Sequence, residues 1–162
     1  MSTQDPFVPQ EKKLPSLLNV LTILTFIGSG FALLSIPFMK WSGGFVKKAM
    51  ENPEAMSSLP PEKQAEMEKT LTLFKEMEAN STVLWIITLL AVALCVYGAI
   101  QMRKLKKEGF YLYAIGELFP LIATGFFIGF ATQYVNMQSY IFGIGIPVLF
   151  VILYATQLKY MK

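Results

Sequence analysis

Three long stretches without charge constrain the fold of this chain more than any other feature. Residues 14–39 and 79–102 carry no charged side chain, and residues 109–158 carry only that of Glu117. A helix that crosses a membrane needs about 20 apolar residues. The first two stretches therefore fit one span each, and the third fits two. Soluble helices are apolar along one stripe, whereas these segments are apolar on all sides.

These stretches predict an all-α integral membrane protein built as a four-helix bundle. We expect spans at residues 16–39, 81–102, 110–131 and 139–158, a loop at 40–80, a basic turn at 103–109, a polar turn at 132–138, and tails at 1–15 and 159–162. The first apolar stretch is longer than the 7–15 residues typical of a signal peptide, so we expect it to remain as a span.

The loop at 40–80 is the one long hydrophilic segment, with six lysines and seven glutamates. Pro60-Pro61-Glu62 favours a helix start, because proline suits the first turn and an acid suits the positive helix end. The apolar residues that follow share one helical face: Met67, Leu71 and Phe74. We expect an amphipathic helix up to Ala79 and a shorter one around 44–51. This hairpin either packs over the mouth of the bundle or docks a partner or the membrane surface.

Positive charges cluster in one short turn, at Arg103, Lys104, Lys106 and Lys107, while the turn at 132–138 has none. Lysine and arginine in short loops are retained on the cytoplasmic side. The asymmetry therefore predicts that both termini and the basic turn are cytoplasmic, and that the 40–80 hairpin is extracytoplasmic. The expected location is the cell membrane, which is the inner membrane in a bacterium.

Glu117 is the one acidic residue inside the predicted spans, roughly 11 Å below the basic end of its helix at about 1.5 Å per residue. A charged side chain at the centre of a membrane helix costs about 2.5–3.5 kcal/mol on insertion scales. We therefore expect partners for Glu117 on neighbouring turns and helices. The candidates are Tyr113 and Thr124 on the same helix face, Thr22 and Thr25 of the first span, Cys95 of the second and Tyr154 of the fourth.

Two functions fit these features. The first is a non-enzymatic scaffold or accessory subunit, in which Glu117 is an interhelical hydrogen-bonding residue. The second is a small carrier, in which Glu117 binds a proton or a cation, because intramembrane acids often mark ion pathways. An enzyme is disfavoured, since the chain has no histidine and one carboxyl group cannot act as both acid and base. With one cysteine as well, we expect no zinc, no haem and no other cofactor.

Prolines lie within both of the last two predicted spans. Pro120 and Pro147 are each about ten residues from the basic end of their helix. Proline removes a backbone donor inside a helix, so we expect helix breaks at both positions and at similar depth. Paired broken helices near the membrane midplane are a feature of transporters, which favours the carrier hypothesis.

Two pairs of small residues have the spacing of helix-packing motifs. Gly28 and Ala32 form one pair in the first span, and Gly125 and Gly129 form the other in the third. Such pairs let helices approach closely, within one chain or between copies. The expected partners are the lipid bilayer and a protein or second copy bound through the hairpin or the spans. Nucleic acid is not expected, because the basic residues do not line one exposed face.

Two segments resemble small four-span membrane proteins common in Bacteroidota. They are VLTILTFIGSG at 20–30 and MRKLKKEGFYLYAIG at 102–116. The resemblance covers the spans better than the 40–80 loop. It implies the four-span topology and a bacterial inner membrane, and it implies no activity.

Overall fold

The computed structural model describes residues 14–50, 57–134 and 136–162, and within these ranges all regular structure is helical. The elements are α1 (Ser16–Met50), α3 (Pro61–Ala79), α4 (Ser81–Arg103), α5 (Glu108–Ile128), α6 (Phe130–Gln133), α7 (Met137–Tyr140), the π-helix η1 (Ile141–Gly145), α8 (Ile146–Gln157) and the 3-10 helix η2 (Leu158–Tyr160). The predicted all-α class is confirmed.

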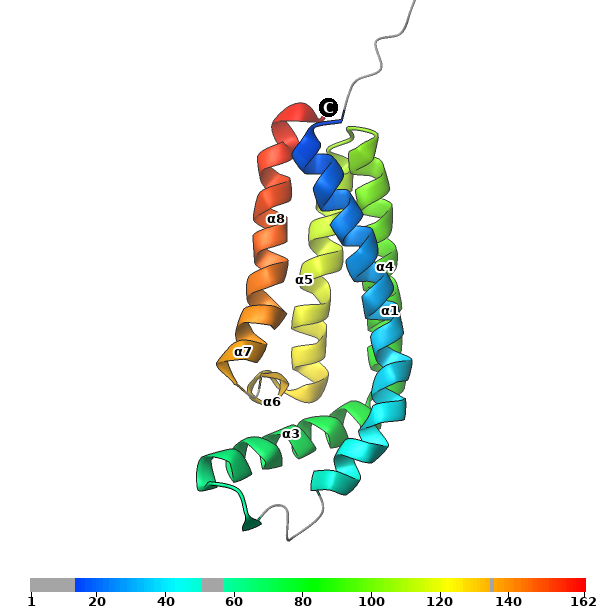
Figure 1. Ribbon diagram of the computed structural model, residues 1–162. Helices are drawn as coiled ribbons and strands as arrows, with labels where there is room; N and C mark the ends of the chain where they lie inside the picture. Colours follow the sequence, from blue (N-terminus) through cyan, green and yellow to red (C-terminus); the bar gives the residue numbers. More distant parts are fainter. Residues whose placement is uncertain (1–13, 51–56, 135) are drawn as a thin grey trace, which may run out of the picture.

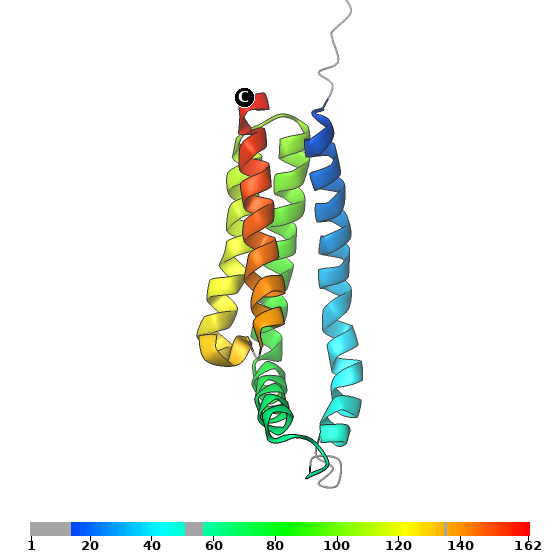
Figure 2. The same cartoon turned by 60° about the vertical axis from the view of Figure 1, so that its left-hand side comes forward.

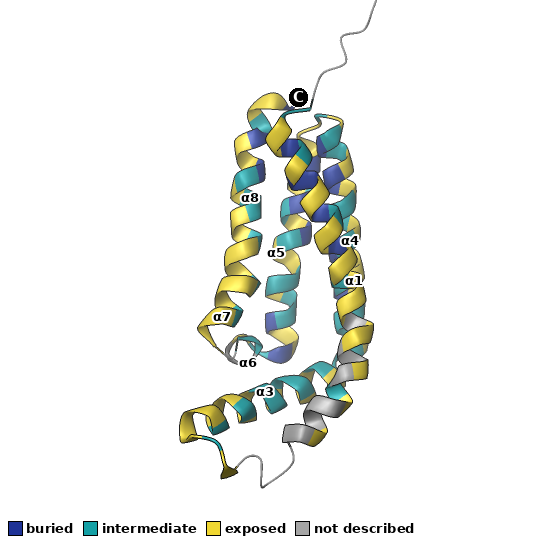
Figure 3. Ribbon diagram, in the orientation of Figure 1, coloured by how far each residue is buried: buried dark blue, intermediate teal, exposed yellow. Residues whose placement is uncertain are grey.

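Four segments are long and apolar enough to cross a membrane: Ser16–Ser35, Ser81–Arg103, Glu108–Ile128 and Met137–Tyr160. They run side by side as a four-helix bundle (Figures 1 and 2). Many residues on the outside of the bundle are exposed (Figure 3). They include large apolar residues such as Phe126, which is 84% exposed, and Phe31, which is 68% exposed. Lipid is the solvent that suits such a surface, so the protein is a membrane protein.

The first helix is longer than predicted. The sequence predicts a span that ends at 39 and a separate short helix around 44–51, but α1 runs without interruption to Met50 with Pro37 inside it. Neighbouring turns and side chains tolerate proline in membrane helices, so this residue does not end the helix. Residues 1–13 and 51–56 lie outside the described residues. The apolar face predicted at 44–51 involves side chains that are likewise not described.

The tightest helix contact joins α4 and α5 through glycines. A Cβ atom on Gly98 would lie 2.7 Å from the Gly109 carbonyl oxygen, and one on Gly109 would lie 2.5 Å from the Gly98 carbonyl oxygen. Both distances are shorter than real side-chain contacts, so any larger residue would separate the two backbones. Two turns further along α5, a Cβ atom on Gly116 would lie 2.9 Å from Cys95 Sγ. The pairing of α4 with α5 therefore depends on these glycines.

The two small-residue pairs singled out in the sequence do not make this contact. A Cβ atom on Gly28 would meet nothing within 4 Å, and Ala32 lines a cavity with it. Gly125 packs against the ring of Phe130, and Gly129, with φ of 90°, ends α5. Neither pair therefore makes a close contact between the membrane-spanning helices of one chain, and packing between copies stays a prediction. The first pair borders open space, and the second allows the chain to turn back on itself.

The prolines also act differently from the prediction. Pro120 lies inside α5, which stays continuous from Glu108 to Ile128. Pro147 lies in the first turn of α8, directly after η1. Proline is tolerated there because the first turn needs no backbone donor. Pro120 therefore does not break its helix, whereas the fourth span is irregular directly before Pro147, in the π-helix at 141–145.

The buried core lies at the basic end of the bundle. Its largest members are Leu18, Leu21, Met102, Tyr113 and Tyr154. By contrast, α7 and η1, at the other end of the fourth span, contain no buried residue. The four helices are thus packed together at one end and splayed at the other (Figure 3).

The basic turn and the C-terminal segment are joined at the packed end. The Lys107 amide donates to the Lys162 carbonyl at 3.0 Å, and the Lys162 amide donates to the Leu105 carbonyl at 2.8 Å. Leu105 adopts a positive φ of 58° within this turn. Six basic residues therefore gather at this end: Arg103, Lys104, Lys106, Lys107, Lys159 and Lys162.

Helix α3 lies across the splayed end of the bundle (Figures 1 and 2). It begins at Pro61, as the sequence predicts, and its half-buried positions recur at helical spacing and include Met67, Leu71 and Phe74. Residues of α3 line a cavity together with the first turns of α4 and the end of α5. The interpretation that this helix packs over the mouth of the bundle is therefore confirmed.

Candidate functional site

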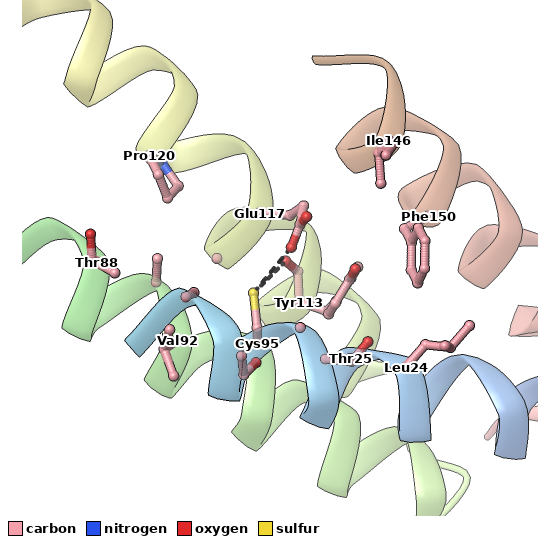
Figure 4. A pocket seen from close by; sticks show the side chains of 15 residues that line it. Leu24, Thr25, Thr88, Val92, Cys95, Tyr113, Glu117, Pro120, Ile146 and Phe150 are labelled. Carbon is pink, nitrogen blue, oxygen red and sulfur yellow. Dashed lines mark hydrogen bonds between the residues drawn. The ribbon is translucent and has the colours of Figure 1, made fainter. Parts of the chain in front are cut away.

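Glu117 lies on α5 at the boundary between the packed and the splayed halves of the bundle. Its carboxyl group accepts a hydrogen bond from the thiol of Cys95 on α4, with Sγ 3.4 Å from Oε2 (Figure 4). The neighbouring Gly116 leaves the space that brings the two groups together, since a side chain there would occupy the position of the thiol. The close α4–α5 contact thus positions the partner of Glu117.

Two tyrosines and a threonine close the site on its basic side. The hydroxyl groups of Thr25 on α1 and Tyr154 on α8 are 2.8 Å apart. The rings of Tyr113 and Tyr154 pack with their centroids 4.5 Å apart, and both residues are almost fully buried. Tyr113 lies one turn before Glu117 on α5 and lines the same cavity. Polar groups from all four spans therefore meet within one layer of the bundle.

On the splayed side, Glu117 borders a cavity of about 350 Å³. All four membrane-spanning segments contribute to its lining, as Figure 4 shows for Thr25 of α1, Cys95 of α4 and Phe150 of α8. Of the described residues that line it, Glu117 is the only charged one. The carboxyl group therefore faces a cavity from within the bundle and has no basic partner among the lining residues.

Two of the predicted neighbours belong elsewhere. Thr22 accepts a hydrogen bond from Arg103 Nη1 at 3.2 Å and donates to the Asn19 carbonyl, one turn nearer the basic end. Thr124 donates to the Pro120 carbonyl at 2.6 Å and accepts from Gln133 Nε2 at 2.7 Å, towards the splayed end. Each therefore has partners at another depth, and of the six predicted neighbours Tyr113, Thr25 and Cys95 border the Glu117 cavity.

The structure adds Ser29 to the cavity and assigns definite contacts to Cys95 and Tyr154. Ser29 lies one turn after Thr25 on α1 and is 9% exposed. The sequence contains a signal for this pair, because a threonine and a serine four residues apart share a helix face. It also contains a signal for the α4 contact, in the small residues Ala91, Cys95 and Gly98, which recur along one face.

The polar groups of the site are a carboxyl group, a thiol and hydroxyl groups. Within the described part of the chain, no group of three or more His, Cys, Asp or Glu residues lies close enough to hold a metal ion. A carboxyl group, a thiol and several hydroxyl groups instead form a hydrogen-bonding layer. Such a layer can hold one proton or one positively charged group at Glu117.

The Thr25–Tyr154 hydrogen bond gives a prediction for stability. Tyr154→Phe keeps the ring packing against Tyr113 but removes the hydroxyl, so the apparent melting temperature in detergent should fall. Interhelical hydrogen bonds in membrane proteins contribute on average about 0.6 kcal/mol, so we expect a small decrease of a few degrees. Tyr160→Phe, at a 50% exposed tyrosine, is the matched control and should leave the melting temperature unchanged. An equal effect of both substitutions would contradict the role assigned to this bond.

Comparisons of the chain with protein-family models, with curated proteins and with solved structures find no match. The function must therefore be argued from the geometry of the site.

Proposed function

We propose that this membrane protein is a small carrier that binds a proton or a cation at Glu117. The observation that supports the proposal most directly is the position of the carboxyl group. It faces a cavity inside the four-helix bundle, and no basic residue is found among the described residues that line the cavity. Intramembrane acids that face a cavity often belong to proton or ion pathways.

A single carboxylate gives such a site a simple coupling rule. It neutralises one positive charge, so a proton and a cation compete for the same group. Release of one then accompanies binding of the other, which is the requirement for exchange across a membrane. We further propose that the protein is not an enzyme, because the chain has no histidine and Glu117 has no second acidic or basic residue beside it among the described residues of its cavity.

A scaffold or accessory subunit is the second candidate. It is favoured by α3, which contains no buried residue although it spans Pro61–Ala79. One face of this helix lines a cavity with the bundle, and the opposite face is exposed. A partner protein has access to that face. Loss of complex formation after substitutions on it, with Glu117 intact, would support this candidate.

We propose a cell-membrane location, the inner membrane in a bacterium, with both termini and the basic turn in the cytoplasm. The positive-inside rule supports this orientation. In a Cys95→Ser background, Lys106→Cys should react with an impermeant thiol reagent only after the membrane is opened. Gln138→Cys, which is exposed in the turn at the opposite end, should react in intact cells. The reverse labelling pattern would contradict the orientation.

The carrier proposal is tested in proteoliposomes that contain a pH-sensitive dye. With an outward gradient of a monovalent cation, vesicles that contain the protein should take up protons as the cation leaves. Protein-free vesicles supply the background leak. A proton flux equal to this background with sodium, potassium and organic ammonium ions would contradict the carrier function.

A further inference from the structure

A second cavity, of about 810 Å³, lies between α3 and the mouth of the bundle. Thr88 of α4 lines both this cavity and the cavity at Glu117. Its hydroxyl donates to the Leu84 carbonyl of its own helix at 2.9 Å, so it does not bridge the helices at the junction. The two cavities therefore adjoin at one side chain.

The larger cavity has the character of a site for an apolar group. Its lining contains large apolar and aromatic side chains: Leu71, Phe74, Met77, Leu84, Trp85 and Ile128. Lys75 and Glu78 are the charged residues among the described part of the lining, and their charges cancel. Such a cavity attracts neither cations nor anions strongly, but it buries apolar surface.

The smaller cavity has the character of a site for a positive head group. Glu117 provides the charge, and the rings of Tyr113 and Phe150 line the same space. Aromatic faces attract ammonium groups, and more strongly when water is excluded. The two cavities therefore differ in chemistry in a way that would orient an amphiphilic cation.

A bare metal cation fits the smaller cavity poorly. Hard cations take six or more oxygen ligands. Beyond the carboxyl group, the described side chains of the lining offer only hydroxyl oxygens, with no second carboxylate and no side-chain amide. An ammonium group needs fewer acceptors, because its apolar substituents are satisfied by van der Waals contact.

The geometry also defines the route to Glu117. Towards the basic end, the site is closed by the packed layer that contains Tyr113, Tyr154, Leu18 and Met102. Towards α3, it continues past Thr88 into the larger cavity. One route to Glu117 in this conformation therefore leads from the α3 side through the two adjoining cavities.

We propose that the two cavities form one site for an amphiphilic ammonium ion, with the charged head at Glu117 and the apolar body under α3. This inference rests on the proposed function and names its substrate class. The volumes of both cavities lie within the range of about 300–1,000 Å³ that is typical of small-molecule sites.

The test uses 4-phenylbutylamine and its uncharged analogue 4-phenylbutanol. Trp85 lines the larger cavity, so its fluorescence in a Trp41→Phe variant reports a phenyl group bound there. We expect saturable binding of the amine and at least about tenfold weaker binding of the alcohol, because the alcohol cannot form the charge pair. Equal binding of both compounds would overturn the proposal.

Two further variants locate the ligand. Glu117→Gln should weaken binding of the amine to the level of the alcohol. Thr88→Phe, which fills the junction, should also weaken it about tenfold, whereas Thr82→Phe, at an exposed threonine of the same helix, should have no effect. Unchanged binding in Glu117→Gln or in Thr88→Phe would overturn the bipartite site.

The failure of this inference can be distinguished from failure of the carrier proposal. Proton flux coupled to sodium or potassium, without selective amine binding, would refute the amphiphilic ammonium site and leave the carrier intact. Selective binding that depends on Glu117, without flux of any cation, would support the site and refute transport.

Discussion

Replacing Glu117 by glutamine is expected to reduce cation-coupled proton flux to the level of protein-free vesicles while the protein stays folded in the membrane. The amide keeps the size of the side chain and an oxygen that accepts the hydrogen bond from Cys95. It cannot bind and release a proton, and it carries no charge to attract a cation. Because Glu117 is the only charged residue among the described residues lining its cavity, no neighbouring group can replace it.

Glu108→Gln is the matched control for this experiment. Glu108 is an exposed residue in the first turn of the same helix, so the substitution removes the same charge outside the cavity. We expect unchanged flux in this variant. Flux that survives in Glu117→Gln, or that is lost equally in Glu108→Gln, would contradict the carrier mechanism. A fall in melting temperature in Glu117→Gln, in a protein that never shows flux, would instead favour a structural role.

Replacing Gly98 by valine is expected to cause the largest loss of stability of any single substitution considered for this protein. The new Cβ atom would lie 2.7 Å from the Gly109 carbonyl oxygen and 2.8 Å from the Tyr113 amide nitrogen. Both are backbone atoms, so α4 and α5 must move apart. Overpacking costs about 1–3 kcal/mol, which corresponds to a decrease of roughly 2–12 °C in apparent melting temperature for a chain of this size.

Gly30→Val provides the comparison, because a Cβ atom at Gly30 would meet nothing within 4 Å. Both variants place a β-branched residue in a membrane-spanning helix, so they share the effect on helix propensity. Thermal unfolding in detergent, followed by circular dichroism, should show a large decrease for Gly98→Val and little change for Gly30→Val. Similar decreases in the two variants would mean that the α4–α5 contact is not the cause.

The four spans could be predicted from the sequence because charge alone constrains them. A lysine or glutamate inside the bilayer is costly, so the uncharged stretches mark the spans directly. The end of α1 was harder to predict, since the polar residues after Met39 and the proline at 37 both suggest a boundary. A helix that leaves the membrane is free to continue in water, and α1 continues to Met50.

The glycines show why helix contacts were less predictable than the spans. Gly28 and Gly125 have the spacing of packing motifs, yet the close contact is made by Gly98, Gly109 and Gly116. The spacing of residues along one helix identifies a face made of small residues, but it does not identify which neighbouring helix packs against that face. That choice depends on the rotation of each helix in the bundle, which no residue pattern in one span specifies.

The Glu117 site was predicted in part for the same reason. Tyr113, on the same helix, and Cys95, at similar depth on α4, are near the carboxyl group as expected. Thr22 lies one turn closer to the basic end than expected, where Arg103 is its partner. Depth from the end of a span places a residue only to within about one turn, and this interval separates Thr22 from Thr25.

The central claim is that Glu117 exchanges a proton for a positively charged ligand. Difference infrared spectroscopy of the protein in lipid, recorded before and after addition of the cation, observes this exchange directly. The account predicts that the carboxylic acid band of a buried group is lost and a carboxylate band appears on binding, and that neither change occurs in Glu117→Gln. A spectrum in which the cation binds but the same bands are unchanged, or change equally in Glu117→Gln, would contradict it.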